Sequence, residues 1–213
     1  MATWFLATVT AAGLAQVFRH GSGGGGGGMI GLVIVGVVVL VFVGWIVGTY
    51  NGLVRVRQQV RESWSGIDTE LKRRYDLIPN LVETVKGYAA HEKSVLEAVT
   101  EARAKAVASN GRPAQQAADE NVLVGSMRKL FAVAEGYPDL KASVNFLELQ
   151  KQLAITEDRI QGARRFYNGN VRDLNTRISV FPSNIIAGVF GFQNEDFFEI
   201  ENVAERGPVG VKL

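Results

Sequence analysis

Histidine and cysteine, the side chains best suited to catalysis and metal binding, are scarce in this chain. Its 213 residues include two histidines and no cysteine, so thiol catalysis, disulfides and thiolate zinc sites are excluded. The stretch HEKSV, residues 91–95, begins like the His-Glu-x-x-His motif that binds zinc on one helical face, but Val95 replaces the second histidine. We therefore expect His91 to occupy an exposed helix position rather than a metal site.

Other catalytic arrangements are equally incomplete. Neither His20 nor His91 is accompanied by the nucleophile elbow of a Ser-His-Asp site. The glycines at 23–28 precede no strand and lack the Lys-Ser/Thr of a phosphate-binding loop. Glu157 with Asp158, and Glu195 with Asp196, are neighbours whose side chains point apart on a helix. The sequence predicts no catalytic residue, no cofactor and no bound metal, and we expect that the protein is not an enzyme.

Basic residues gather at Lys72, Arg73 and Arg74, and again at Arg164 and Arg165. Such runs are usually solvated helix faces held by ion pairs. The functional alternative is contact with anionic lipid head groups or with an acidic partner. Arg73 and Arg74 are the candidate residues for that contact.

The stretch FPSNIIAGVFGFQNEDFF, residues 181–198, is crowded with large apolar side chains. It either folds onto the end of the domain that precedes it or contacts a partner or a membrane, because large apolar patches are seldom left exposed. The candidate interaction residues are Phe190, Phe192, Phe197 and Phe198.

Residues 29–50, MIGLVIVGVVVLVFVGWIVGTY, contain no ionisable group except Tyr50. A helix of that length, at about 1.5 Å per residue, covers the roughly 30 Å hydrocarbon core of a bilayer. Gly44 and Gly48 form a Gly-x-x-x-Gly pair that allows close approach of another helix. We predict a transmembrane helix at 29–50, with these two glycines as candidate contact residues.

Residues 1–28 form an apolar leader and a poly-glycine linker. A weak signal peptide, a surface or re-entrant helix, and a product of an upstream start codon or of cloning are the alternatives for it, and Met29 is the more natural beginning. Arg55, Arg57 and Arg61 follow the span, against Arg19 before it, which favours a cytoplasmic position for the larger C-terminal part. The expected location is the bacterial cell membrane, crossed once.

Apolar residues recur at sevens from residue 52 onward, which predicts long helices packed on one another. One row runs through Val60, Ile67 and Leu81 and is interrupted at Arg74. Turn formers at 109–113 and 135–138 divide the pattern, and nothing in 51–180 alternates with period two for long. We predict an all-α fold: an antiparallel, up-and-down bundle of four segments at 51–182, followed by an apolar, Phe-rich tail at 183–213.

Pro79 lies inside this pattern, in RRYDLIPNLVETV, residues 73–85. A proline in a helix removes one hydrogen bond and clashes with the preceding turn. Splitting 52–108 there gives two pieces that match the next segment in length, so we favour a break, with Pro79 as the hinge. A kink in a continuous helix is the alternative, supported by the unbroken phase of the apolar rows.

Three blocks of the sequence closely resemble the LemA family of bacterial membrane proteins. They begin with YNGLVRVRQQ at Tyr50, YPDLKASVNF at Tyr137 and FPSNIIAGVF at Phe181, and the resemblance extends from residue 29 to about residue 200. It implies a short N-terminal transmembrane helix, a helical bundle and a role in the bacterial envelope. It also implies genes near membrane metallopeptidases of the HtpX type and kinship with a protein of magnetosome formation, but no biochemical activity.

These observations predict a membrane-anchored, non-catalytic scaffold or adaptor that self-associates or binds envelope proteins. Membrane remodelling or lipid organisation is the alternative, and an enzyme with an unrecognised site is the remote one. Expected partners are membrane lipid, further copies of the chain and membrane proteins such as an HtpX-type metallopeptidase. The nearly balanced net charge of +2 argues against nucleic acid.

Overall fold

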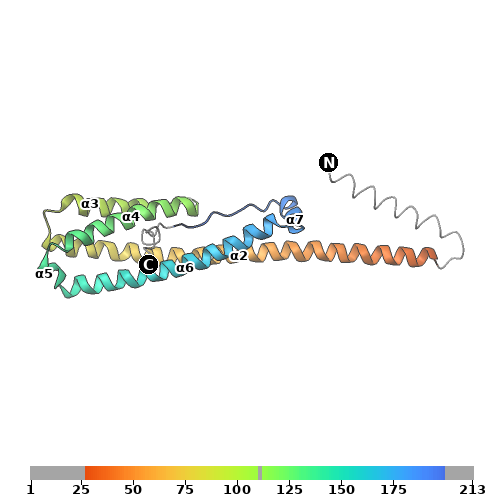
Figure 1. Ribbon diagram of the computed structural model, residues 1–213, viewed down its shortest axis with the longest axis horizontal. Helices are drawn as coiled ribbons and strands as arrows, with labels where there is room; N and C mark the ends of the chain where they lie inside the picture. The colour runs from red at the N-terminus through yellow and green to blue at the C-terminus, as the bar shows by residue number, and fades with distance from the viewer. Residues whose placement is uncertain (1–26, 110–111, 200–213) are drawn as a thin grey trace, which may run out of the picture. The chain divides into compact units, whose positions relative to one another are not determined.

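The computed structural model describes residues 27–109 and 112–199, and within these ranges it contains helices and no strand (Figure 1). The predicted all-α fold is therefore confirmed. The helices are α2 (Gly27–Tyr88), α3 (Lys93–Ala108), α4 (Pro113–Ala134), α5 (Pro138–Lys141), α6 (Val144–Ser179) and α7 (Ser183–Val189). The predicted leader lies outside the described residues, apart from Gly27 and Gly28, which begin α2.

The chain divides into two compact units, residues 1–51 and 52–213. In the first unit the described residues all belong to α2, and nearly all of their large apolar side chains are exposed. This part of the helix is long and apolar enough to cross a membrane. A helix with exposed apolar side chains suits a lipid environment, where its own backbone hydrogen bonds satisfy the polar groups of the backbone. It fits a membrane anchor, as the sequence predicts.

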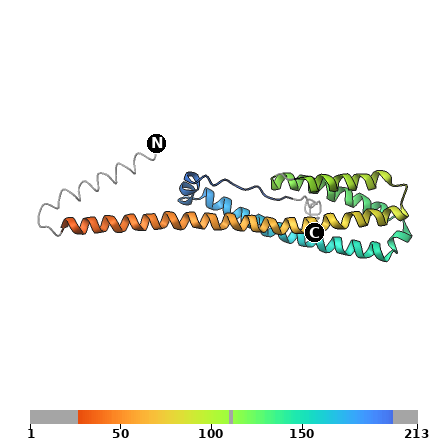
Figure 2. The same cartoon turned by 180° about the vertical axis from the view of Figure 1, so that it is seen from behind.

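The second unit is built on two long helical stretches of nearly equal length. Residues 52–88 of α2 and the 36 residues of α6 each extend about 55 Å at 1.5 Å per residue. With 16 and 22 residues, α3 and α4 are much shorter, and they lie beside only the part of this pair nearest to α5 (Figures 1 and 2). The four helices enclose one apolar core, and the following side chains in it are fully shielded from solvent: Ile67, Ile78, Leu81, Val85, Val99, Leu123, Leu130, Ile160 and Leu174.

An extended segment, residues 192–199, covers part of the long pair that α3 and α4 leave open. Its backbone is held by two asparagines one heptad apart on α6. Asn168 donates to the carbonyl of Phe198 at 3.1 Å and accepts from its N–H at 2.9 Å. Asn175 does the same with Glu195, at 3.0 and 2.9 Å. Each amide therefore replaces the pair of hydrogen bonds that a neighbouring strand would supply.

Phe198 is the apolar anchor of this segment. Its side chain is fully buried and belongs to the bundle core. The ring of Trp64 meets it edge-on, with centroids 5.3 Å apart, and Trp64 meets Tyr167 in the same way at 5.3 Å. Because such edge-to-face pairs stabilise beyond simple area burial, these aromatic contacts fix the segment in place. This end of the predicted tail is part of the folded bundle.

The predicted break at Pro79 is wrong, because α2 continues through it to Tyr88 and the chain reverses at residues 89–92. Pro79 has no N–H, so the carbonyl of Tyr75, four residues earlier, lacks its helical donor. Nε of Arg103 on α3 donates to that carbonyl at 2.7 Å. The proline is tolerated because a neighbouring helix supplies the missing hydrogen bond. The prediction assumed that each helical segment has neighbours of matching length. Instead, residues 192–199 cover part of the long helices that α3 and α4 leave open, so residues 52–88 form one continuous helix.

This explanation of Pro79 is testable with a double-mutant cycle. Arg103→Ala should cost about 1.5–3 kcal/mol of unfolding free energy, because it leaves the Tyr75 carbonyl without a donor. In a Pro79→Ala background, the restored N–H of residue 79 satisfies that carbonyl, and Arg103→Ala should cost markedly less. Urea denaturation of the full chain in detergent, followed by circular dichroism, measures all four variants. Equal costs of Arg103→Ala in both backgrounds would refute the explanation.

Candidate functional site: a buried polar network

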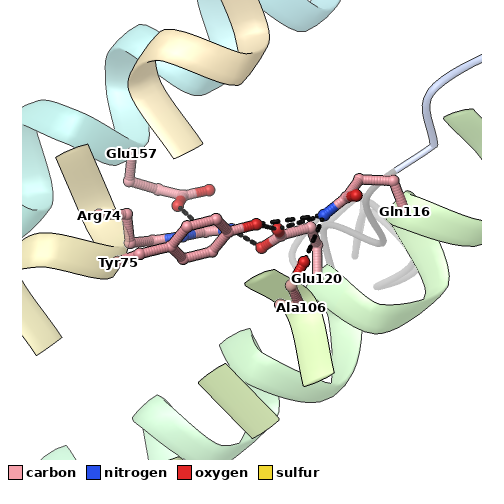
Figure 3. A network of polar contacts seen from close by, with 6 residues as sticks. All are labelled: Arg74, Tyr75, Ala106, Gln116, Glu120 and Glu157. Carbon is pink, nitrogen blue, oxygen red and sulfur yellow. Dashed lines mark hydrogen bonds and ion pairs between the residues drawn. The ribbon is translucent and has the colours of Figure 1, made fainter. Parts of the chain in front are cut away.

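The most unusual side chain in the bundle is that of Arg74 of α2, which is 1% exposed. It lies between two carboxylates from different helices (Figure 3). Nη1 donates to Glu157 of α6 at 2.9 Å, and Nη2 donates to the fully buried Glu120 of α4. A charge removed from water needs such partners, because an unpaired buried ion costs several kcal/mol. One arginine thereby joins α2, α4 and α6.

Glu120 is held by two more polar side chains. The hydroxyl of Tyr75 donates to Oε1, and Nε2 of Gln116 donates to the same oxygen at 3.0 Å. Gln116 also lies within hydrogen-bond distance of the Tyr75 hydroxyl, at 3.1 Å, and of the Ala106 carbonyl near the end of α3, at 3.1 Å. The network therefore reaches α2, α3, α4 and α6, and both oxygens of Glu120 are satisfied.

The network keeps Tyr75 protonated. Burial of its side chain, together with the negative charge of Glu120 beside it and the hydrogen bond to that carboxylate, raises the pKa of Tyr75 well above its ordinary value of 10.0. Burial also raises the pKa of Tyr167 far above that value, and the charges of Glu195 and Asp196 add to the effect. Neither hydroxyl is available as a base at neutral pH.

The geometry supports structure rather than chemistry. Glu120 has no exposed surface, and Glu157, at 36% side-chain exposure, is the member of the network nearest to solvent. Within 27–109 and 112–199 no group of three His, Cys, Asp or Glu residues could hold a metal ion. An open groove of about 810 Å³ lies elsewhere, between Val82 and Lys86 of α2 and Leu96 and Thr100 of α3, and none of the network residues lines it. This groove therefore does not lead to the buried charges.

The predicted basic run separates into different environments. Arg74 is buried, so its predicted position on a solvated or lipid-contacting face is wrong: it occupies a core position on the heptad row and is paired inside. Lys72 and Arg73 remain at the surface, paired with Asp68 at 2.6 Å and Glu70 at 3.7 Å. Lipid contact by Arg73 stays a prediction.

The predicted phenylalanine surface is divided as well. Phe192 and Phe198 are buried, so they are corrected from interaction residues to packing residues; the guanidinium of Arg57 lies 4.8 Å above the Phe192 ring. Phe190 is 51% exposed and Phe197 36%. In the first unit, Gly44 and Gly48 have nothing within 4 Å of where a Cβ would lie, and their role as a helix contact stays a prediction.

Sequence reasoning missed Glu120, Gln116 and the two clamping asparagines. Two features of the sequence indicated the buried pair. Arg74 interrupts an apolar row, and Glu120 lies three residues after the buried Ala117 and three before the buried Leu123. A charged residue on an apolar row indicates either a break in the row or a buried pair, and here the second holds.

Comparison with known proteins identifies relatives of the chain. The family model described as the LemA family matches residues 63–213. The magnetosome protein MamQ 2 of Paramagnetospirillum magneticum is 25% identical over 186 residues, covering 76% of this chain and 68% of that protein. Protein LemA of Metamycoplasma hominis is 26% identical over 160 residues, covering 74% and 72%. MamQ of Magnetospirillum gryphiswaldense is 23% identical over 182 residues, covering 74% and 67%.

Removing both members of the buried ion pair should cost less than the sum of the costs of removing each one alone. Arg74→Met or Glu120→Leu alone should cost about 3–5 kcal/mol of unfolding free energy, because each leaves a buried charge with fewer partners. The double variant should cost clearly less than the sum. Urea denaturation of the full chain in detergent measures these unfolding free energies. As a control, removing the exposed pair Lys72 and Asp68 should change the unfolding free energy by under about 1 kcal/mol. Strict additivity would contradict a coupled network.

The bundle should also lose stability in alkali. A tyrosine whose pKa is raised by folding stays neutral in the bundle while the unfolded chain deprotonates above the ordinary value of 10.0. Stability is therefore intact below about pH 10 and falls above it, by about 1.4 kcal/mol per pH unit for each tyrosine. The part of the tyrosinate absorbance that comes from Tyr75 and Tyr167 should appear together with loss of helical circular dichroism, and Tyr167→Phe should reduce the slope. Full tyrosine ionisation near pH 10 with an intact bundle would disprove this.

Proposed function

The chain belongs to the LemA family, and we propose that it acts as a membrane-anchored scaffold or adaptor that binds other proteins rather than catalysing a reaction. The names of its relatives, LemA and MamQ, designate no enzymatic activity. An apolar helix that fits a membrane anchor precedes the bundle in the chain. Anchoring confines encounters to the membrane plane, so weak contacts between bundles suffice for assembly.

One observation carries the proposal: Arg74, Tyr75 and Glu120 of the polar network are buried, while a large aromatic side chain faces solvent. Phe166 on α6, which directly follows the basic pair Arg164 and Arg165, is 66% exposed. Its near neighbours on the same face are Gly162 and Gly169, at which an added Cβ would meet no atom within 4 Å. A protruding ring between two glycines leaves room for a ring from another helix.

A second copy of the chain fits this face best. When two α6 helices lie side by side, Phe166 of each meets a glycine of the other, so the surface is complementary to itself, as the interface of a symmetric dimer must be. Ile155, 43% exposed and eleven residues earlier, extends the face by about three helical turns. Full burial of a phenylalanine contributes roughly 1.5–3 kcal/mol, enough to bias assembly between anchored molecules.

Membrane remodelling is the second candidate, favoured by the exposed apolar side chains of residues 180–190. It requires many copies on one bilayer, so it shares the self-association step with the leading proposal. Binding to a membrane metallopeptidase of the HtpX type and a cytoplasmic position of the bundle stay predictions.

Crosslinking in native membranes tests the proposal. A photoreactive phenylalanine analogue at position 166 should give an adduct of about twice the chain mass of 23.1 kDa. Chemical crosslinking of the unmodified chain should give a dimer of the same mass. Phe166→Ser should abolish that dimer without changing the melting temperature, and Val122→Ser, at a position 51% exposed on α4, should leave it intact.

The other outcomes are equally informative. An adduct of different mass that Phe166→Ser removes would favour an adaptor for another membrane protein over self-association. Absence of any adduct from position 166, with the protein folded and in the membrane, would overturn the proposal.

A further inference from the structure

The residues around α7 carry an exposed apolar surface with no charge in it. Its five exposed side chains are Val180, Phe181, Ile185, Val189 and Phe190, with exposed fractions of 51%, 75%, 54%, 74% and 51%. No ionisable residue occurs between Arg177 and Glu195. These five side chains are called the α7 apolar surface below.

This surface is held in place by a folded turn. Ile186 and Ala187, on the other face of α7, are buried. The hydroxyl of Ser183 donates to the carbonyl of Arg177 at 2.6 Å, which fixes the start of the turn to the end of α6. Gly191, at φ 69°, ends α7 in the left-handed conformation, and the N–H of Phe192 bonds back to the Ala187 carbonyl at 2.9 Å. The apolar side chains are therefore presented outward by a defined scaffold.

Both flanks of α7 contact the first residues of the bundle. Before it, Nη1 of Arg177 lies 3.9 Å from the position of a Cβ at Gly52. After it, the Phe192 ring lies under the guanidinium of Arg57, 4.8 Å away. Gly52 follows the apolar stretch 29–50 by two residues in the chain. The α7 apolar surface thus lies at the end of the bundle where the chain emerges from its membrane anchor.

We propose that the α7 apolar surface inserts into the lipid interface as a second, peripheral membrane contact. A bilayer is the occupant that the position favours, because a point only two residues beyond a transmembrane stretch lies at the head groups. Basic residues lie nearby: Arg55 and Arg61 are exposed on the adjoining turns of α2, and Arg177, which is paired with Asp173 at 3.0 Å, lies beside Gly52. Basic side chains around an apolar centre are typical of surfaces that bind anionic membranes.

The inference goes beyond scaffolding and does not rest on it, since it requires only the membrane anchor. Two contacts with one bilayer restrain the tilt and rotation of the bundle, which a single helix does not. Phe166 and the α7 apolar surface are separate parts of the molecule, so each proposal fails or stands alone.

The absence of cysteine makes a direct test possible, because one introduced cysteine is the single labelling site. The full chain carrying Val189→Cys is labelled with an environment-sensitive fluorophore and placed in phosphatidylcholine vesicles with or without phosphatidylglycerol. We expect a blue-shifted emission and strong quenching by spin-labelled lipids. The control is Val144→Cys, 79% exposed at the start of α6, which should be quenched several-fold less.

Each outcome decides the question. Stronger quenching at 189 than at 144, increased by anionic lipid and weakened by Phe181→Ser, supports insertion. Equal quenching at both positions overturns it. A blue-shifted probe at 189 without lipid quenching also overturns it and assigns the surface to a protein contact. Circular dichroism of the labelled chains verifies that the bundle is intact.

Discussion

The buried charge of Arg74 is the constraint on which the bundle depends. A guanidinium is tolerated inside a protein only where carboxylates reach it with good geometry. Here one carboxylate comes from α4 and the other from α6, and both must arrive at the same turn of α2. Apolar rows alone allow helices to slide by a turn at small cost, whereas an ion pair does not. The network thus joins α4 and α6 to one turn of α2.

Helices of unequal length pose a second problem, which the C-terminal segment solves. Where α3 and α4 end, the paired faces of α2 and α6 would present Trp64 and Tyr167 to water. Phe198 covers them, and Asn168 and Asn175 satisfy backbone groups of the covering chain that have no helix or sheet to join. Apolar burial supplies the attraction, and the two amides supply the alignment.

The sequence allowed the helices to be predicted because their apolar rows persist over many turns. It did not allow the reversal point to be located, since the effect of Pro79 depends on whether Arg103 reaches the carbonyl of Tyr75, which lies 28 residues before it in the sequence. The fate of Arg74 was hidden for the same reason: a charge on an apolar row is explained only by its partners, and Glu120 is 46 residues distant. The asparagine clamps were missed because asparagine is common in turns and its pairing with a distant backbone leaves no periodic trace.

The clamped segment also has a consequence for the order of events during synthesis. Ribosomes deliver residues 195–198 after both of the helices that they cover, so Trp64 and Tyr167 are synthesised before the residue that shields them. The two rings keep an exposed apolar surface until Phe198 has been synthesised and packs against Trp64. A chain that is truncated or stalled before residue 198 keeps Trp64 and Tyr167 exposed. Chaperones and proteases bind exposed apolar surface of this kind, so docking of Phe198 removes a site at which an incomplete chain would be recognised.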